Sequence, residues 1–149
     1  MKTKAKSTRA ERSALEMEFM QLLILGLGAQ PWCRCWRQNT GQVEVRDARG
    51  AVRGVFRAGP PTGAADVSGL VAGGRRLEIE CKAADGARTV EQERWAAMVA
   101  RFGGLYLLAQ LRPDEPVAEA VVRVVADVAR AAGAEVDAAA LARALRSIA

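Results

Sequence analysis

The sequence predicts a mixed α+β domain in which a mixed β-sheet is flanked by helices. Three observations lead to this prediction. Apolar residues recur at helical spacing near the N-terminus, residues 42–82 read as strands separated by turns, and one apolar strand lies between later helices. The chain has 149 residues, which suits one domain and is enough to bury a core.

The first part of the chain is expected to form a helix, a short strand and a hairpin. The helix covers 8–28 and is closed by Pro31. A strand follows at 32–37, and 42–57 reads as a hairpin whose bend is at 47–50. The apolar residues at helical spacing in the helix are Leu15, Phe19, Leu22, Leu23 and Leu27.

A second hairpin is expected after a loop that breaks regular structure. That loop is the run Gly-Pro-Pro-Thr-Gly at 59–63. Residues 64–72 and 75–82 read as the two strands, and the glycine pair at 73–74 reads as their tight turn.

The remaining elements are helices on either side of one strand. Thr89 is a good N-cap for a helix through residue 102, with Gln92 at its third position as a capping box. A buried strand at 105–111 is apolar on both faces. Asp114 is expected to cap a helix to about residue 132, and Asp137 a last one.

The charge of the chain favours nucleic acid as a partner. The net charge is +5, and much of the excess lies in a basic tail at 1–7 that contains Lys2, Lys4 and Lys6. Such a tail is either solvated or bound to a phosphate backbone. A second basic stretch contains Arg34, Arg37, Arg46, Arg49, Arg53 and Arg57.

The residues that are absent exclude several function classes. With no histidine, the chain has no Ser-His-Asp or Cys-His catalysis and no histidine-based zinc hydrolase site. Three cysteines, an odd count, indicate a reducing compartment, so a cytoplasmic location is expected. The apolar run 22–27 is too short to span a bilayer, so no membrane partner is expected.

One lysine stands apart in a chain that is otherwise rich in arginine. Only four of the 22 basic residues are lysines, and Lys82 is the only one after residue 6. Lysine is a compact point charge, whereas arginine is a wide fork. A compact cation two residues after Glu80 is what a metal-dependent phosphodiester cleavage site requires.

Two carboxylates are expected near this lysine. Glu78, Glu80 and Lys82 leave the same face of the strand at 75–82. Asp66 lies on the preceding strand of the same hairpin, at the end that meets Glu80. Two acids from neighbouring strands form an oxygen-ligand site suited to Mg²⁺ or Mn²⁺. The alternative is a solvated row of charges on a half-buried strand.

The order of these motifs resembles a known nuclease family. Asp66 followed by Glu80-Cys81-Lys82 is similar to the motif of the PD-(D/E)XK nuclease superfamily, with Ala65 in place of its proline. Within that superfamily, the chain most resembles the VRR-NUC family. The resemblance covers about residues 10–110. The segments that resemble that family are 37–41 (RQNTG), 63–66 (GAAD), 79–82 (IECK), Gly86, 89–95 (TVEQERW) and 103–104 (GG).

The resemblance implies a restriction-endonuclease-like core and a role for each motif residue. Asp66 and Glu80 would be metal ligands, with the backbone carbonyl of Cys81 as a third. Lys82 would act on the attacking water. Gln92 would steer Lys82 or the phosphate, in addition to its role in the capping box.

The resemblance also implies an acid from the first helix and contacts to DNA. Glu18 is the acid that we expect, and Glu16 is the alternative. Arg37 and Asn39 would contact DNA phosphate or shape the turn beside the site. The nuclease core would occupy 8–112, and 113–149 would be a helical extension of the same domain.

The resemblance implies a Mg²⁺- or Mn²⁺-dependent DNA endonuclease. Its expected substrate is branched DNA, such as a four-way junction or a flap, or duplex DNA. A stand-alone chain of this size resembles the small phage and bacterial members of the family, in bacterial or phage-infected cytosol. The alternatives are a non-catalytic nucleic-acid-binding or assembly protein on the same fold, and a structural domain with a charged hairpin.

A homodimer is expected, held partly by the two C-terminal helices. The apolar residues expected at the interface are Val117, Val121, Val124, Val125, Val128, Leu141, Leu145 and Ile148. In the alternative arrangement these helices fold back onto the open face of the sheet.

The basic tail generates the first testable prediction. Deleting residues 1–7 removes three lysines, and each phosphate contact contributes to the salt dependence of DNA binding. If all three touch phosphate, the log–log slope of affinity against salt should flatten by roughly two to three units. Fluorescence anisotropy with labelled duplex measures the slope, and an unchanged slope would show that the tail is only solvated.

Overall fold

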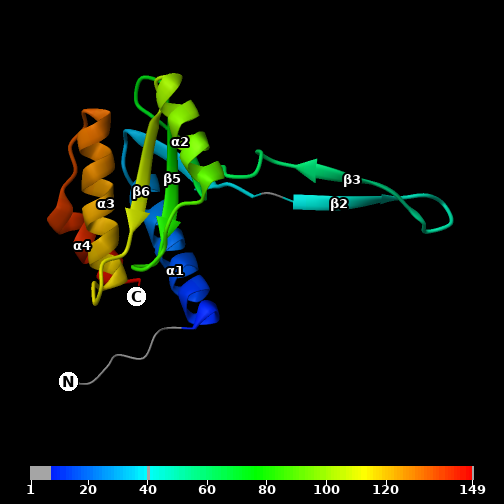
Figure 1. Ribbon diagram of the computed structural model, residues 1–149. Coiled ribbons are helices and arrows are strands. Elements are labelled where there is room, and N and C mark those ends of the chain that lie inside the picture. Colours follow the sequence, from blue (N-terminus) through cyan, green and yellow to red (C-terminus); the bar gives the residue numbers. More distant parts are fainter. Residues whose placement is uncertain (1–7, 40, 149) are drawn as a thin grey trace.

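A four-stranded mixed sheet lies at the centre of the computed structural model, which describes residues 8–39 and 41–148 (Figure 1). Its strands, in spatial order, are β1 (Cys33–Arg37), β4 (Val67–Val71), β5 (Arg75–Lys82) and β6 (Leu105–Gln110). Strand β4 pairs antiparallel with β1 and β5, whereas β6 runs parallel to β5. The predicted mixed α+β class is therefore confirmed.

Helices cover both faces of this sheet. Helices α1 (Arg9–Gly28) and α3 (Val117–Ala132) pack on one face, and α2 (Val90–Arg101) lies over β5 and β6 on the other (Figure 1). Helix α4 (Ala138–Arg146) packs against α3. The crossover through α2 is what allows β6 to run parallel to β5.

Strand β5 lies in the interior of the sheet and has two different faces. Leu77, Ile79 and Cys81 are at most 3% exposed and join the apolar core with α1 and α3. Glu78 and Glu80 point to the opposite face, as period-two alternation requires, and are also buried. Both faces of β5 are thus covered.

Helix α1 begins at a capping box and reaches the core through its second half. Thr8 is the N-cap. Its side chain accepts a hydrogen bond from the backbone of Glu11, whose side chain accepts one from Thr8. The side chains that face the core are Phe19, Met20, Leu23 and Leu27, whereas Leu15 is 40% exposed. The predicted core positions Phe19, Leu23 and Leu27 are therefore confirmed, whereas Leu15 is not part of the core.

Strands β2 (Gly41–Arg46) and β3 (Val52–Ala58) form a separate hairpin that projects from the sheet and helices (Figure 1). Nearly every side chain in these strands is exposed. The hairpin predicted at 42–57 is confirmed, with its bend between Asp47 and Ala51.

The start of α3 differs from the prediction. The helix begins at Val117, after Pro116, and not after Asp114. Asp114 has a φ of 61°, so it lies in a turn of the left-handed region and does not occupy an N-cap position. Asp137 does cap α4, since its side chain accepts a hydrogen bond of 2.9 Å from the backbone N of Ala140.

The valine face of α3 is buried inside the subunit. Val121, Val125 and Val128 are 0% exposed and pack in the core with α1. A Cβ on Gly26 of α1 would lie 3.1 Å from a methyl group of Val121, so the two helices approach closely here. The prediction that this face holds a dimer is wrong, and the alternative in which these helices fold back is confirmed.

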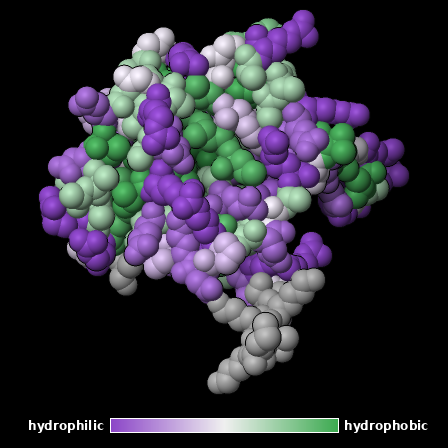
Figure 2. Space-filling view, turned by 60° about the vertical axis from the view of Figure 1, so that its left-hand side comes forward, coloured by the Kyte–Doolittle hydropathy of each residue, from purple (hydrophilic) through white to green (hydrophobic). Residues whose placement is uncertain are grey.

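Apolar and hydrophilic side chains are interspersed on the face shown in the space-filling view (Figure 2). Among the helices of the described residues, none is long and apolar enough to cross a membrane.

An ion pair between α3 and the segment that precedes it generates a prediction about stability. Arg123 donates to both carboxylate oxygens of Glu115, at 2.8 and 2.7 Å, and to the carbonyl of Gln110. The hydrogen bond from Arg123 lowers the pKa of Glu115 below its usual value. Glu115→Gln should lower the free energy of unfolding by about 1–2 kcal/mol at neutral pH.

The pH dependence of this effect follows from linkage. A lowered folded-state pKa stabilises the fold above the unfolded-state pKa, and the stabilisation is lost as the pH falls through the folded-state pKa. Urea unfolding at neutral and acid pH should therefore show a difference between Glu115→Gln and wild type that shrinks in acid. A constant difference would show that charge plays no part.

Candidate active site

Asp66 lies beside the last residues of β5. It immediately precedes β4, whose Val67 is in register with Ile79 of β5. The backbone N of Cys81 donates a 2.8 Å hydrogen bond to one carboxylate oxygen of Asp66. The predicted juxtaposition of this acid with Glu80 and Lys82 is therefore present, because the tight turn at 73–74 sets the register of the hairpin.

Lys82 and Glu80 form a shielded ion pair. Their side chains are 17% and 1% exposed, and the Lys82 Nζ lies 2.7 Å from Oε1 of Glu80. Gln92 donates through Nε2 to the same oxygen. The second oxygen of Glu80 is buried and has no hydrogen-bond partner among the described residues. One oxygen is thus shared by two donors while the other is left for a ligand.

Gln92 forms the predicted capping box and also contacts the site, but through Glu80 and not through Lys82. It is the third residue of α2, where its backbone N donates to the side chain of Thr89 and its own Oε1 accepts from the backbone N of Thr89. Its Nε2 reaches Glu80 rather than Lys82. The capping box therefore fixes the amide that contacts the site.

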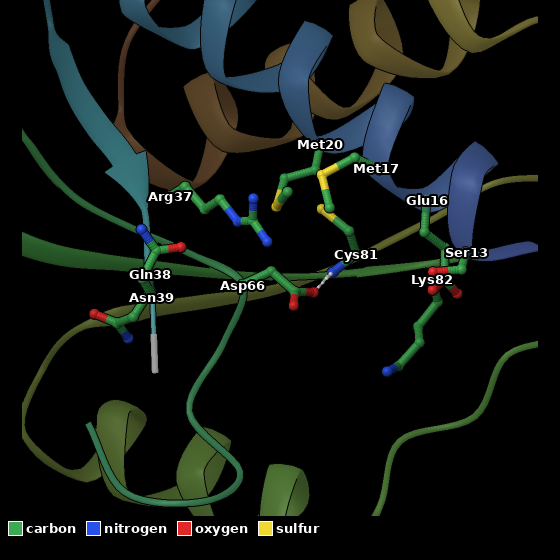
Figure 3. A pocket seen from close by; sticks show the side chains of 10 residues that line it. All are labelled: Ser13, Glu16, Met17, Met20, Arg37, Gln38, Asn39, Asp66, Cys81 and Lys82. Atoms are coloured by element: carbon green, nitrogen blue, oxygen red, sulfur yellow. Dashed lines mark hydrogen bonds between the residues drawn. The ribbon is translucent and has the colours of Figure 1, made fainter. Parts of the chain in front are cut away.

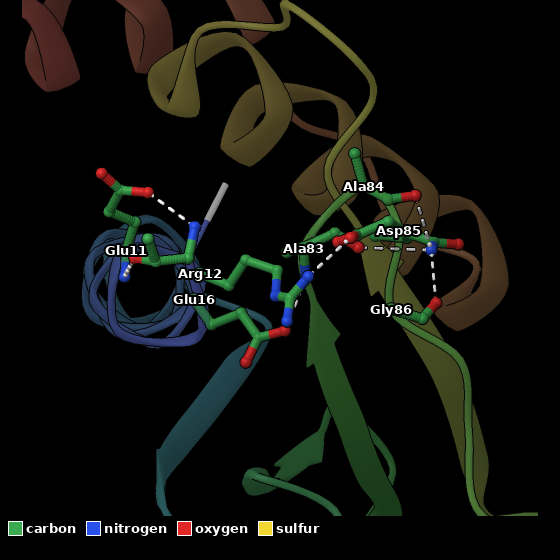
Figure 4. A network of polar contacts seen from close by, with 9 residues as sticks. Glu11, Arg12, Glu16, Ala83, Ala84, Asp85 and Gly86 are labelled. Carbon is green, nitrogen blue, oxygen red and sulfur yellow. Dashed lines mark hydrogen bonds and ion pairs between the residues drawn. The ribbon is translucent and has the colours of Figure 1, made fainter. Parts of the chain in front are cut away.

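The first helix contributes Glu16 to the site. Its Oε1 accepts a 2.8 Å hydrogen bond from the backbone N of Ala83, directly after β5 (Figure 4). Glu16 lies three and four residues before Phe19 and Met20, so it shares their sheet-facing side. Glu18 is exposed and does not line the cleft, so the alternative acid, and not the expected one, lies at the site.

The turn after β5 is held from two sides. Gln110 of β6 donates through Nε2 to the carbonyl oxygens of Ala83, Ala84 and Gly86, at 3.3, 3.2 and 2.7 Å. On the other side, Arg12 of α1 forms a 2.9 Å ion pair with Asp85 (Figure 4). These contacts fix the start of α1 relative to Lys82.

Glu16, Asp66 and Lys82 line an open cleft of about 320 Å³ (Figure 3). Glu80 and Gln92 contact Lys82 and Glu80, respectively, but are not among the residues that line the cleft. Arg37 and Asn39, the expected DNA contacts, lie in its wall: Arg37 is the last residue of β1, and Asn39 follows two residues later. The predicted contacts Lys2, Lys4 and Lys6 lie outside the described residues. The full lining is Ser13, Glu16, Met17, Met20, Arg37, Gln38, Asn39, Asp66, Cys81 and Lys82.

The carboxylates of the cleft act on one another. Burial raises the pKa of Asp66, against the hydrogen bond from Cys81 and the charge of Lys82. Burial also raises the pKa of Glu80, where Asp66 and Glu16 add to the increase. Burial alone would lower the pKa of Lys82, but its hydrogen bond to Glu80 and the surrounding carboxylates raise it overall. The cleft therefore favours an additional cation.

The donor set fits a hard divalent ion. Among residues 8–39 and 41–148, no three acidic, cysteine or histidine side chains lie close enough to hold a metal together. Mg²⁺ nevertheless requires only one or two carboxylates, with waters for the remaining ligands. Asp66 and the buried, unpartnered oxygen of Glu80 supply such oxygens. The Cys81 side chain is 3% exposed and belongs to the core cluster, and its backbone N donates to Asp66.

Sequence reasoning missed the environment of Glu78. This side chain is fully buried, contrary to the alternative of a solvated charged row. It accepts hydrogen bonds from Ser68 (2.8 Å), Arg76 (2.6 Å), Trp95 (3.2 Å) and Gln38 (3.4 Å). Gln38 lines the cleft, so Glu78 fixes one of its walls. The charge pattern of the strand gave no signal for this burial, because the covering helix lies further along the chain.

Comparisons with known proteins do not identify the chain. No protein-family model matches it, and no curated protein matches it either.

The burial of Asp66 generates a prediction that does not depend on activity. A raised folded-state pKa means that the charged carboxyl destabilises the fold above that pKa, and that this cost vanishes in acid. In EDTA, Asp66→Asn should therefore raise the free energy of unfolding at neutral pH by about 1 kcal/mol. The amide oxygen can still accept from Cys81.

Urea unfolding with and without Mg²⁺ tests this together with metal binding. Saturating Mg²⁺ should stabilise the wild type and leave Asp66→Asn unchanged, because an ion that binds only the folded state shifts unfolding by mass action. Glu18→Gln is the matched control and should respond to Mg²⁺ like the wild type. An equal response of Asp66→Asn and wild type to Mg²⁺ would exclude Asp66 as a ligand.

Proposed function

We propose that the protein is a Mg²⁺- or Mn²⁺-dependent DNA endonuclease. The observation that carries this proposal is the meeting of Asp66, Lys82 and Glu16 in one cleft. The buried Glu80 is paired with the Lys82 ammonium at 2.7 Å. A protein that only binds nucleic acid gains nothing from carboxylates beside phosphates. The same carboxylates are useful where a divalent ion and a scissile phosphate bind together.

Asp66, Glu80 and the backbone carbonyl of Cys81 would hold the metal. Such an ion offsets the charge that develops on the phosphate and lowers the pKa of a bound water. In the reaction, a water oxygen bonds to phosphorus, and one phosphodiester P–O bond breaks. Glu16 is placed to accept a hydrogen bond from a water on the α1 side of the cleft.

Lys82 would act as a charged donor toward the phosphate and the attacking water. Its raised pKa keeps the side chain protonated at neutral pH while it is paired with Glu80. An ammonium group donates up to three hydrogen bonds, and only one is directed to Glu80. Lys82 therefore orients water and offsets negative charge in this arrangement, and Gln92 keeps Glu80 in place.

Polar and positively charged side chains along the cleft would bind the DNA backbone. Arg37 and Asn39 lie in its wall, and Lys2, Lys4 and Lys6 would add contacts from the tail. The substrate that we propose is branched DNA, a four-way junction or a flap, with duplex DNA bound more generally. Proteins of this kind locate their substrates through phosphate contacts, which carry no sequence information.

Cleavage of labelled duplex, flap, splayed and four-way DNA tests the function. Wild type should cut with Mg²⁺ or Mn²⁺ and not in EDTA, and Asp66→Asn and Glu80→Gln should each abolish cutting. Glu16→Gln should reduce the rate, whereas the matched change Glu18→Gln should leave it unaltered. DNA binding without cutting under all metal conditions would favour the alternative, a non-catalytic nucleic-acid-binding or assembly protein.

Lys82→Arg tests whether a compact cation is required. The guanidinium keeps the charge but is wide and planar, so it should not replace the ammonium at the water and Glu80. A loss of about 100-fold or more in the single-turnover rate is expected, in line with other directed donors in active sites. Retention of the wild-type rate would make Lys82 an ordinary surface cation.

We also propose that the protein acts as a homodimer, which would set two cleavage sites at a fixed separation. Light scattering at micromolar concentration should then give twice the subunit mass of 15.9 kDa. Since the valine face of α3 is buried within the subunit, its side chains are not the proposed interface. A mass equal to one subunit would reject the dimer.

A further inference from the structure

The β2–β3 hairpin is a projecting arm that contributes no residue to the cleavage site described above. An isolated two-stranded hairpin is at best marginally stable in water. Here the bend is reinforced by Asp47, whose side chain accepts hydrogen bonds from the backbone N of Arg49 (2.9 Å) and Ala51 (3.0 Å) and from Nε of Arg53 (2.8 Å). A bend organised in this way fixes the backbone of Arg49 at the tip of the arm.

The arm is positively charged. It carries four arginines, Arg46, Arg49, Arg53 and Arg57, against Glu44 and Asp47. Glu44 pairs with Arg46, and Asp47 pairs with Arg53. Arg49 has no ion-pair partner among the described residues, and Arg57 donates only to the hydroxyl of Thr62, at 3.1 Å. Two cationic groups, at the tip and at the root, are therefore available to an anionic partner.

Both ends of the arm are attached to the cleft. Asn39 in the cleft wall lies just before β2, and the loop that follows β3 leads to Asp66. A groove of about 390 Å³ lies at the root of the arm, lined by Gly41, Gln42, Arg57 and residues 60–64. None of the described residues that line this groove is acidic. Backbone phosphates that leave the cleft would meet the groove first and the tip of the arm next.

We propose that the β2–β3 hairpin is a DNA-binding arm that lies along the duplex beside the scissile phosphate, with Arg57 and Arg49 each contacting the backbone. This proposal rests on the proposed function, because it names the part of the substrate that the arm holds. Six residues of β2 at about 3.3 Å each span about 20 Å. With base pairs about 3.4 Å apart, the tip should contact DNA about six base pairs beyond the point where the root of the arm meets it.

The apolar side chains of the arm are compatible with this partner. Val43 and Phe56 are cross-strand partners, and Val45 follows on the same face; they are 58%, 62% and 51% exposed. A two-stranded ribbon fits the major groove, where apolar side chains contact thymine methyl groups. The excess positive charge favours DNA over a second copy of this chain, which carries a net charge of +5 and the same arm.

Salt-dependent anisotropy in EDTA tests the arm without any cleavage. The probe is a fluorescein-labelled duplex of about two helical turns. Arg49→Ala and Arg57→Ala should each flatten the log–log salt slope by about one unit, since each removes one phosphate contact. Arg143→Ala is the matched control, because Arg143 is exposed on α4, away from the arm in Figure 1, and it should leave the slope unchanged.

Hydroxyl-radical footprinting on a flap substrate locates the contact. With Asp66→Asn to prevent cutting, protection should cover the junction and extend along the duplex to about six base pairs beyond the point where the root of the arm meets it. Adding Arg49→Ala should remove only the distal protection. Wild-type slopes and footprints in both arginine variants would overturn the proposal.

A protein partner would give a different result. If the apolar face of the arm binds a second chain, Phe56→Ser should lower the mass measured by light scattering while the arginine variants keep the wild-type salt slope, and the proposal would be overturned. The anisotropy result does not depend on the nuclease activity. A slope that flattens in a protein that never cuts DNA would support the arm and reject only the endonuclease.

Discussion

Burial of two glutamates on one face of β5 is the constraint on which the rest of the structure depends. A buried carboxylate costs several kcal/mol unless it is paired and hydrogen-bonded. Glu78 takes its partners from β4, β5, α2 and the segment after β1. Glu80 takes Lys82 from its own strand and Gln92 from α2. These hydrogen bonds hold the cover of the sheet and the walls of the cleft at fixed positions, so stability and the geometry of the site have the same origin.

The alternation of β5 could be predicted from sequence, but the cover over each face could not. Leu77, Ile79 and Cys81 read correctly as the apolar side of a strand. For the charged side, period-two spacing states only that Glu78 and Glu80 share a face, and not whether that face meets water. Helix α2 covers the charged face of β5, and its start could be predicted from the Thr89–Gln92 capping box in the sequence. Its packing over β5 depends on a crossover connection that no local pattern specifies.

Helical patterns proved ambiguous in the same way. In α1, a stripe through Leu15 and Leu22 includes Glu18, whereas the stripe through Met20 and Leu23 that meets the sheet includes Glu16. Apolar residues occupy most of the circumference of α1, so the sequence does not show which stripe faces the sheet. The stripe that faces the sheet determines which of the two glutamates reaches the cleft. In α3, the valine stripe correctly indicated a buried face. An amphipathic pattern identifies such a face but not its partner, which here is α1 of the same chain.

The position of Lys82 gives a physical reason for lysine in a chain that otherwise uses arginine. Its stem lies against the turn after β5, where a Cβ on Gly86 would be 3.1 Å from both Cβ and Cδ of Lys82. Gln110 holds that turn through the carbonyl of Gly86. The alkyl stem passes beside the turn and delivers one compact charge to the Glu80 oxygen that also accepts from Gln92. A guanidinium carries its charge on a wide plane, which suits a shared carboxylate oxygen less well than a compact ammonium does. The buried glutamate therefore gives a physical reason for a compact cation at position 82.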